Sequence, residues 1–538
     1  MEQPDFIIVG GGSAGAVAAA RLSENPKNSV LLLEAGGESN SFLVSMPAGF
    51  AKMLTNPRFD WCYEQQPDKS INGRRFLWSA GKMLGGSTAI NGLVYIRGTS
   101  ADHQRWVDDG CPGWSFEDCL PYYRRSEVFT GEPSQYHGSH GELGVGPMAD
   151  PHPLTSVFLD ACSESGLPIC EEYCGGIGEG SFESLTTQKQ SRRSSTASAF
   201  LTPARKRSNL QIITGAHVTR ILFDGTKAVG VEALVGGKTL EWHTAGEIIV
   251  SAGAVGSPAL LMRSGIGPAE TLRSLGIEII ADRPQMGKNL QEHPTVAINK
   301  FVNVPTYNSQ MKPWHLASSL VKYLLSGKGP MATPAVQAMA WARSSKGLAA
   351  PDLQLHFYPV GFDLDPEKTS AAGADMPTEP VITIGASVGN PRSRGEVIIN
   401  SADPQVLPSI SHELIGDPHD VDSLVGACKL IEGIFSAPSF KQYIVADRTP
   451  SPIPNDDAHW KEYIRTKTGV SYHPAGTCRM GSDADAIVSP QLAVKGISNL
   501  RIADASIIPS LPCANTNAVA IMIGERVADF ANQQTGNH

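Results

Sequence analysis

The feature that most constrains this fold is a short apolar run that leads directly into a glycine-rich turn. The run is Phe6–Val9, and Gly10, Gly12 and Gly15 follow it at the spacing of a strand that turns tightly into a helix. Gly10 allows the turn, Gly12 lets a pyrophosphate approach the backbone, and Gly15 lets helix and strand pack closely. The N-terminal N–H groups of that helix would face the phosphates. The N-terminus therefore predicts a β-α-β unit that binds a dinucleotide.

An acidic residue closes this unit. A second apolar run, Val30–Leu33, ends in Glu34, 19 positions after Gly15. A carboxylate at that place can accept hydrogen bonds from the adenosine ribose hydroxyls, and it repels a 2′-phosphate, which disfavours NADP. NAD and FAD both carry an ADP half, so this motif alone leaves the choice between them open.

Length and charge narrow the class of protein. A chain of 538 residues is too long for one ordinary domain, so two or three packed units are expected. The net charge of −9 leaves no basic surface for nucleic acid. No run approaches the roughly 20 apolar residues that a helix needs to span a membrane. We therefore expect neither a nucleic-acid partner nor a membrane span.

The cysteines and the N-terminus bear on location. The nine cysteines contain no repeated CxxC, and the closest pair, Cys170 and Cys174, has no CxxH partner. Reduced thiols are the default for such a set, so no metal site is expected. The first strand begins within a few residues of Met1, which leaves no room for a cleavable signal. We therefore expect a cytoplasmic protein.

The rest of the chain contains two kinds of segment, which differ in their sequence pattern. Residues 101–128 predict helix, Leu210–Val250 alternates apolar and polar residues across short turns and predicts hairpins, and Gly253–Gly267 predicts a helix bounded by glycines. Residues 295–465 differ in their sequence pattern from the N-terminal β-α-β unit. The C-terminal segment is again similar to that unit and ends in a predicted helix over Ala518–Phe530. This order fits a dinucleotide domain that is assembled from separate segments around an insertion.

Five motifs occur in an order that identifies a family. They are Gly81–Gly98, Gly253–Gly267, Gly287–His293, His473–Gly481 and Asn515–Asn517. Together with the N-terminal glycine motif, they resemble the glucose–methanol–choline (GMC) family of FAD-dependent oxidoreductases over nearly the whole chain. Within that family the chain is most similar to bacterial choline-dehydrogenase-like and L-sorbose-dehydrogenase-like proteins. The resemblance implies that the dinucleotide is FAD.

The resemblance also implies the fold. We expect an α/β chain, α+β overall, in which a discontinuous Rossmann-like FAD-binding domain holds an inserted substrate domain with an antiparallel sheet. The FAD-binding domain is expected in residues 1–155, 205–294 and 466–538, of which the last segment carries the catalytic loops. The substrate domain is expected in residues 156–204 and 295–465.

The resemblance further implies which residues contact FAD. Carried over onto the matched motifs, the expected set is Gly10, Gly12, Ser13, Ala14, Gly15, Glu34, Ala35, Gly81, Leu84, Gly85, Gly86, Ser87, Asn91, Gly92, Val94, Val218, Ala252, Gly253, Asp504, Ala505 and Asn517. Some relatives bond FAD covalently through a histidine in the loop that begins at Gly81. That position here is Ile90, which cannot form the bond, so FAD is expected to be non-covalent.

Two residues are predicted to carry the chemistry. Oxidation of an alcohol moves a hydride from the carbinol carbon to flavin N5 while the hydroxyl loses a proton, and an imidazole suits that proton. His473 matches the family's catalytic histidine, and Pro474 restricts its backbone to extended conformations. Asn515 occupies the second family position, where an amide can orient the hydroxyl, although it could instead cap a helix. We interpret His293 as structural.

The leading prediction is an FAD-dependent alcohol dehydrogenase. It would oxidise a polyol, a sugar or another primary or secondary alcohol and pass the electrons to a quinone or another acceptor. An oxidase that reduces oxygen to hydrogen peroxide is the close alternative, since the motifs are shared. A hydroxynitrile lyase, which retains FAD without using its redox chemistry, is the alternative of a different class.

The sequence does not name the alcohol. Choline would need an aromatic cage with a nearby acid, and no such set can be identified from the sequence. The pocket could draw on these aromatic residues: Trp61, Tyr63, Trp314, His315, Tyr323, His356, Phe357 and Tyr358.

Overall fold

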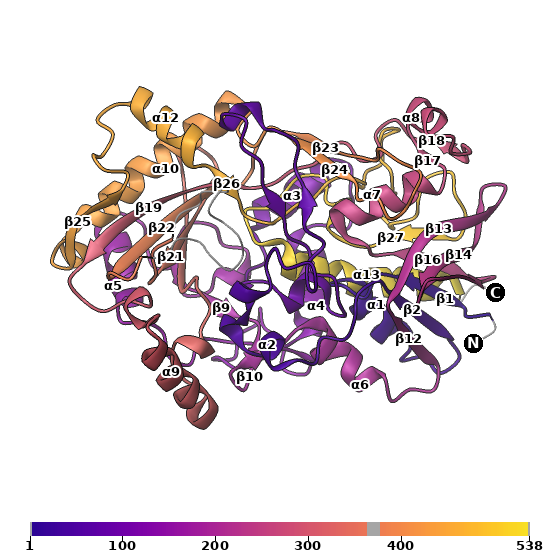
Figure 1. The fold of residues 1–538 in the computed structure, drawn as a ribbon, viewed down its shortest axis with the longest axis horizontal. Helices are drawn as coiled ribbons and strands as arrows, with labels where there is room; N and C mark the ends of the chain where they lie inside the picture. The colour runs from indigo at the N-terminus through magenta and orange to yellow at the C-terminus, as the bar shows by residue number, and fades with distance from the viewer. Residues whose placement is uncertain (1–2, 363–376, 536–538) are drawn as a thin grey trace.

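Two β-sheets, each with its own large cluster of buried apolar side chains, divide the molecule. The structure is a computed structural model that describes residues 3–362 and 377–535. In Figure 1 the sheet that contains β1 (Phe6–Val9) lies at the right, and the sheet that contains β19 (Pro294–Val302) lies at the left. The C-terminal helix α13 (Thr516–Thr535), in yellow, runs from the middle of the molecule to the right.

The sheet at the right is parallel and has five strands in the order β12-β2-β1-β16-β27. The remaining strands are β2 (Val30–Glu34), β12 (Leu210–Thr214), β16 (Glu247–Val250) and β27 (Leu500–Ile502). Every residue of β1, β2 and β16 is buried, which is typical of a parallel sheet that helices cover on both faces.

Helix α1 (Gly15–Leu22) packs on this sheet and against α13, and small residues let it approach closely. An added Cβ at Gly15 would lie 2.0 Å from the carbonyl oxygen of Gly10, and one at Gly524 of α13 would lie 2.5 Å from that of Ala14. Gly10 turns the chain with a φ of +97°. The predicted β-α-β unit is therefore present, and its close approaches require glycine.

The sheet at the left is antiparallel and has seven strands. Six follow the order β25-β19-β22-β21-β20-β8, and β26 also pairs with β19. The other strands are β8 (Gly180–Glu183), β20 (Ala338–Ala342), β21 (Leu353–Tyr358), β22 (Val381–Val388), β25 (Ile444–Thr449) and β26 (Gly469–Val470). Helices α5 (Leu154–Glu164) and α10 (Pro418–Ser436) pack against this sheet.

These two sheets confirm the predicted fold class. All strands of the parallel sheet lie in residues 1–155, 205–294 and 466–538. Strand β26 belongs to the antiparallel sheet although it lies inside the last of these segments. The domain boundaries themselves stay predictions.

Strands β12 and β16 correct the expectation of hairpins throughout 210–250. Strand β12 pairs in parallel with β2 and completes the edge of the parallel sheet, and β16 pairs in parallel with β1 and β27. The antiparallel ladder begins one strand later, with β13 (Ala216–Asp224), β14 (Lys227–Val235) and β15 (Lys238–His243). The alternation of apolar and polar residues alone could not show whether β12 pairs in parallel with β2 or forms a hairpin with the next strand.

Two predicted helices are also divided or shortened. The stretch 101–128 forms α3 (Ser100–Asp108) and α4 (Phe116–Ser126), because Thr99 and Ser115 each begin a helix with a capping box. The helix predicted from Gly253 ends earlier than expected, as α7 (Gly253–Arg263), and a short strand, β17 (Ile266–Gly267), follows it.

The remaining helices and strands connect the elements described above. They are α2 (Phe42–Ser45), β3 (Tyr63–Glu64), β4 (Leu77–Trp78), β5 (Val94–Tyr95), β6 (Glu127–Phe129), β7 (Leu143–Val145), β9 (Leu185–Thr186), β10 (Gln188–Lys189), β11 (Arg192–Arg193), α6 (Thr202–Ala204), α8 (Ala269–Ser274), β18 (Ala281–Asp282), α9 (Pro313–Ser326), β23 (Gly395–Ile398), β24 (Ser409–His412), α11 (Pro438–Lys441) and α12 (Asp457–Lys467). Among the described residues, no helix is long and apolar enough to cross a membrane.

Candidate active site

A cavity of about 690 Å³ runs between the two sheets and is lined by residues from both. Eighteen of the predicted cofactor residues and both predicted catalytic residues line it: Gly10, Gly12, Ser13, Ala14, Glu34, Ala35, Gly81, Gly86, Ser87, Asn91, Gly92, Val94, Val218, Ala252, Gly253, His473, Asp504, Ala505, Asn515 and Asn517. Residues that are distant in the sequence thus share one cavity.

Three predicted cofactor residues lie behind the wall of the cavity instead. Gly15 packs against Gly10, as described above. Leu84 is only 1% exposed, and its backbone N–H donates to the carbonyl oxygen of Gly37. The N–H of Gly85 donates to the carbonyl oxygen of Gly11 at 2.7 Å. Gly15, Leu84 and Gly85 therefore support the glycine turn and the loop 81–94 from behind the wall, and their contact with a cofactor stays a prediction.

The glycine turn and the loop 81–94 form one end of the cavity. An added Cβ at Gly86 would lie 2.7 Å from Cα of Gly12, so the two loops touch. An added Cβ at Gly12 would meet no atom closer than 3.9 Å, and one at Gly92 would meet nothing within 4 Å. Space that a side chain would fill is therefore open beside the N-terminus of α1, which fits a bound pyrophosphate.

The carboxylate of Glu34 lies on the wall of this end. Its Oε2 accepts the N–H of Gly11 at 2.8 Å, and its Oε1 accepts the N–H of Gly36 at 2.7 Å. Burial raises the pKa of Glu34, while these two hydrogen bonds and the charge of Lys82 lower it. Each oxygen keeps a further lone pair, so the group can still accept ribose hydroxyls.

Asp504 joins two segments of the cavity wall. Its Oδ2 accepts the N–H of Gly253 at 2.9 Å and the hydroxyl of Ser257, and its Oδ1 accepts the N–H of Ser506 at 2.8 Å. Burial raises the pKa of this carboxyl, against the same hydrogen bonds. The residues at this end fit FAD, because an acid, open glycines and a helix N-terminus are all in place.

His473 and Asn515 meet at the other end of the cavity. Nδ2 of Asn515 lies 2.9 Å from Nε2 of His473, and Nδ1 of His473 lies 3.0 Å from Nδ1 of His293. Burial and the nearby histidines 293 and 356 lower the pKa of His473 well below its ordinary value. The side chain is therefore neutral near pH 7, as a base must be before it accepts a proton.

The hydrogen bonds of His293 assign the tautomer of His473. Nε2 of His293 lies 3.0 Å from the carbonyl oxygen of Pro512 and 3.2 Å from that of Gly389, and carbonyls only accept. Nε2 of His293 therefore carries the hydrogen, and burial lowers the pKa of this histidine to about 4, which leaves Nδ1 as an acceptor. His473 must then donate from Nδ1, which leaves the lone pair of its Nε2 toward Asn515.

Sequence reasoning missed the direct contact between His293 and His473, and it missed Glu292 altogether. The carboxylate of Glu292 accepts the backbone N–H of His473 at 2.8 and 2.9 Å and that of His293 at 2.9 Å. Burial raises the pKa of Glu292 to about 8. Tyr472, next to the base, has a φ of +61°, which is uncommon for a non-glycine residue. The position of Glu292 directly before His293 was the available signal.

The aromatic residues proposed for the substrate pocket separate into two groups. Trp61, Tyr63, His356 and Tyr358 line the cavity, whereas Trp314, His315, Tyr323 and Phe357 do not. Among the lining residues that the structure describes, the carboxylates are those of Glu34 and Asp504, both on the cofactor segments. The wall that faces the antiparallel sheet is apolar or neutral.

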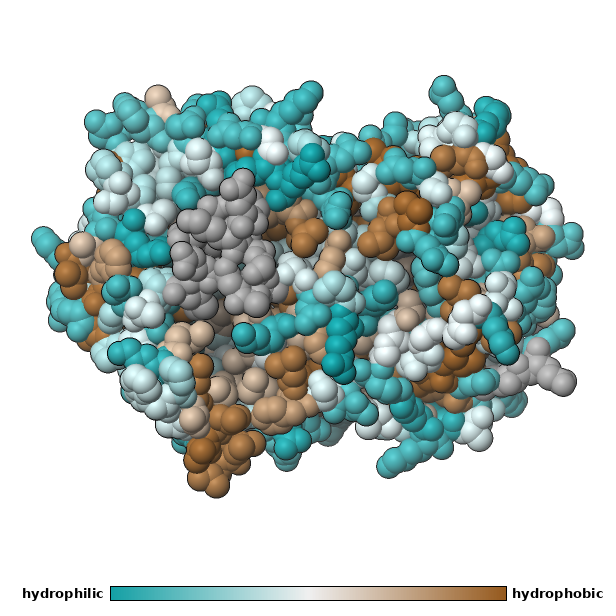
Figure 2. Space-filling view, viewed as in Figure 1, coloured by the Kyte–Doolittle hydropathy of each residue, from teal (hydrophilic) through white to brown (hydrophobic). Residues whose placement is uncertain are grey.

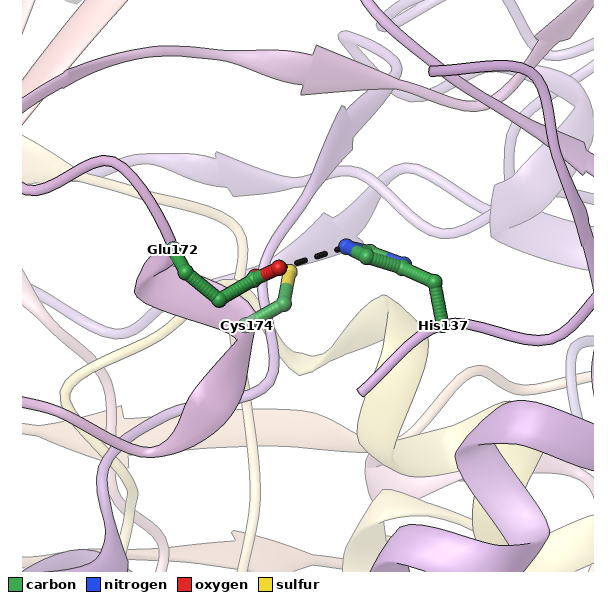
Figure 3. Close-up of side chains that lie close together, drawn as sticks. All are labelled: His137, Glu172 and Cys174. Atoms are coloured by element: carbon green, nitrogen blue, oxygen red, sulfur yellow. Dashed lines mark ion pairs between the residues drawn. The ribbon is translucent and has the colours of Figure 1, made fainter. Parts of the chain in front are cut away.

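A second group of polar side chains lies outside this cavity. Figure 3 shows His137, Glu172 and Cys174, whose possible ligand atoms lie within 4.8 Å of one another. Burial would lower the pKa of His137, but hydrogen bonds to Cys174, Glu127 and Glu172 outweigh it and raise the pKa to about 11. A metal would have to displace that proton and the ion pair of His137 with Glu127, whose carboxylate also pairs with Arg97. The prediction of no metal site therefore stays a prediction, and we interpret this group as an ion-pair network.

The comparison with known proteins decides the family. The GMC oxidoreductase models match residues 4–295 and 391–524. The chain belongs to the GMC oxidoreductase family. It is 37% identical over 530 residues, 98% of this chain and 95% of the relative, to an oxygen-dependent choline dehydrogenase of Rhizobium etli. It is 36% identical over 537 residues, 98% and 95% of the two chains, to an alcohol dehydrogenase [acceptor] of Pseudomonas putida.

The solved structures agree with this assignment. The pyridoxine 4-oxidase from Mesorbium loti superposes with a TM-score of 0.88 at 29% identity and full coverage of both chains. The expected resemblance is thus confirmed. This GMC protein is an FAD-dependent oxidoreductase that acts on alcohol-type substrates.

Proposed function

We propose that this enzyme oxidises a neutral alcohol to the carbonyl compound, with His473 as the base, and passes the electrons to a quinone or another carrier. When bound, FAD supplies the hydride acceptor. Nε2 of His473 takes the hydroxyl proton, and Asn515 donates a hydrogen bond that orients the alcohol. The observation that carries the proposal is the hydrogen-bond order His293–His473–Asn515, which leaves a neutral Nε2 lone pair in the cavity.

A neutral substrate is supported by the charges of the cavity. His356 and Tyr358 line the substrate side, and burial lowers the pKa of His356 to about 3, so its ring is neutral. A quaternary ammonium would need a carboxylate close to an aromatic cage. On the described wall, the carboxylates belong to the cofactor end. We therefore propose a polyol, a sugar or another uncharged alcohol rather than choline.

We propose that FAD is held without a covalent bond. Ile90 lines the cavity in the flavin loop and is a hydrocarbon side chain that cannot bond the flavin. Acid precipitation of the purified protein should release the yellow chromophore into the supernatant. Yellow colour that stays with the pellet would contradict this proposal.

The nine free thiols support the cytoplasm as the proposed location.

Anaerobic stopped-flow mixing tests the reaction. The holoenzyme is mixed with primary alcohols, polyols and choline while the flavin absorbance is followed, and air is then admitted. Bleaching by a neutral alcohol with slow recovery in air supports the proposed dehydrogenase, and choline should react at least about tenfold more slowly. Fast recovery would favour an oxidase, as in the related pyridoxine 4-oxidase. A flavin that no alcohol bleaches would overturn the proposal, and cyanohydrins would then test the lyase alternative.

A further inference from the structure

Helix α9 carries apolar side chains on its outer surface. Trp314 is 64% exposed, Val321 54%, Leu324 62% and Leu325 84%. In Figure 1 the helix projects at the lower left, and Figure 2 shows hydrophobic surface gathered at the same corner of the molecule. A helix that is only solvated does not present such a set, so this face requires an apolar partner.

The charged side chains of this part of the sequence are of one sign. From His293 to Pro351 the sequence contains no aspartate or glutamate, although the whole chain has a net charge of −9. Lys312 and Lys322 belong to the helix or its first turn, and Lys328 follows its end. Asp150 faces them from another segment and pairs with Lys322 at 2.9 Å. Lys312 and Lys328 therefore add positive charge beside the apolar residues.

Tryptophan, leucine and lysine on one short helix are the composition of helices that lie in a membrane interface. The helix has 14 residues, fewer than the roughly 20 that span a bilayer, so it can lie in the surface but cannot cross it. Lysines attract anionic lipid headgroups. The charge thus favours a lipid surface as the occupant.

The position of the helix relates it to the cavity. Met311, directly before α9, lines the cavity and is also 44% exposed, so the cavity opens beside the helix. Phe42, 50% exposed, extends the apolar surface, with its ring 6.2 Å from that of Tyr323. A membrane that holds α9 would therefore lie against this opening.

We propose that α9 inserts its apolar face into the surface of an anionic bilayer and so brings the cavity to a quinone dissolved in the lipid. The electron acceptor rests on the proposed function. The alcohol loses two electrons and two protons to become the carbonyl compound, and the quinone takes the same two electrons and two protons to become the quinol. The enzyme reaches its acceptor without a membrane-spanning helix.

Sedimentation with vesicles tests the docking surface. The holoenzyme is mixed with vesicles of phosphatidylcholine and phosphatidylglycerol (3:1) or of phosphatidylcholine alone. Wild type should sediment with the anionic vesicles, and the double variant W314S/L325S should bind at least about tenfold more weakly. The double variant K312Q/K328Q should lose the preference for anionic lipid. The matched control is Val445→Ser, which removes an apolar side chain of 64% exposure on β25 and should bind as wild type does.

Three outcomes would overturn the docking proposal. They are a wild type that stays in solution, a W314S/L325S variant that binds normally, and a dimer in light scattering that this variant dissociates while vesicles do not bind. The last outcome would make α9 a contact between two copies.

A second measurement separates this inference from the proposed function. The W314S/L325S variant should keep the anaerobic rate of flavin reduction and the activity with a water-soluble dye, yet lose most activity with a quinone incorporated in vesicles. Equal loss with the dye and the quinone would overturn the link to the acceptor. An enzyme that binds vesicles but whose flavin no alcohol reduces would refute the proposed function and leave the docking surface standing.

Discussion

The two sides of the cavity are built in different ways. On the side of the parallel sheet, backbone forms the wall at Gly10, Gly12 and Gly86. The closeness of the loops leaves no room for a side chain at Gly10 or Gly86, whereas the space beside Gly12 is open to a ligand. On the side of the antiparallel sheet, side chains such as His356 and Tyr358 form the wall. A backbone wall fits one ligand and tolerates little change, whereas a side-chain wall can be altered without moving the chain. The cofactor is therefore fixed by the first side and the choice of alcohol by the second.

The most severe test of this contrast is Gly15→Val. A Cβ at this position would lie 2.0 Å from the carbonyl oxygen of Gly10, so the turn must move. We expect protein without bound flavin, and a lowered melting temperature. The ratio of absorbance at 450 nm to that at 280 nm measures flavin content. The control is Gly37→Ala, where an added Cβ meets nothing within 4 Å, and yellow Gly15→Val protein would refute the backbone argument.

His473→Ala should separate chemistry from cofactor binding. The backbone wall is unchanged, so flavin content should equal that of wild type, while the rate constant of flavin reduction falls by about 10²- to 10⁴-fold, the usual effect of losing a general base. Anaerobic stopped flow with the best alcohol measures it. Reduction at near wild-type rate would remove His473 from the mechanism.

His293→Phe removes the acceptor of the Nδ1 hydrogen of His473. The imidazole can then carry its hydrogen on Nε2, and flavin reduction should slow by roughly 10- to 100-fold, less than the loss of the base itself. His293→Asn, whose side-chain oxygen can still accept, should recover part of the rate. Equal rates for both variants would show that His293 only fills space.

Val360→Ala tests the substrate side. Val360 lines the cavity and is 6% exposed, so the substitution enlarges the pocket without touching the glycine loops. We expect unchanged flavin content and a shift of about tenfold in kcat/KM between a short and a branched alcohol. A loss of flavin would contradict the separation of the two sides.

The smallest expected effect is that of pH on flavin reduction. Burial lowers the pKa of His473 well below its ordinary value, so the base stays neutral as the pH falls from 7 to about 6 and the rate should change little. The rate should be lost only when the pH falls through that lowered pKa. A loss centred near pH 6.5 would contradict the buried base. Glu292, with a pKa raised to about 8, should add a small step in the rate near pH 8, and Glu292→Gln should abolish that step.

The sequence predicted most of the cofactor side because its constraints are local. Gly10, Gly12 and Glu34 belong to one β-α-β unit, where the spacing in the sequence is enough to predict that they line the same site. Gly15, Leu84 and Gly85 lie behind the wall of the cavity, and their assignment as cofactor residues stays a prediction. The parallel pairing of β12 was missed because an alternating sequence does not indicate which strand is its partner.

The substrate side could be predicted less well because its residues meet through the tertiary fold. Glu292 and His473 are far apart in the sequence, and their contact depends on how two loops cross. Trp314 was a pocket candidate by its type, yet it points to the outside of α9. Residue type indicates what a side chain can do, but only the fold decides what it touches.

The carboxylate of Glu292 binds the backbone of both histidines just before β19 begins. A redesign of this enzyme for a new alcohol has to keep these hydrogen bonds. Changes on β21 and β22 can reshape the pocket and leave the base in place, whereas an insertion or a shift at the start of β19 would move the base with it. Libraries for a new specificity should therefore vary the middle of the sheet and keep residues 292–294 constant.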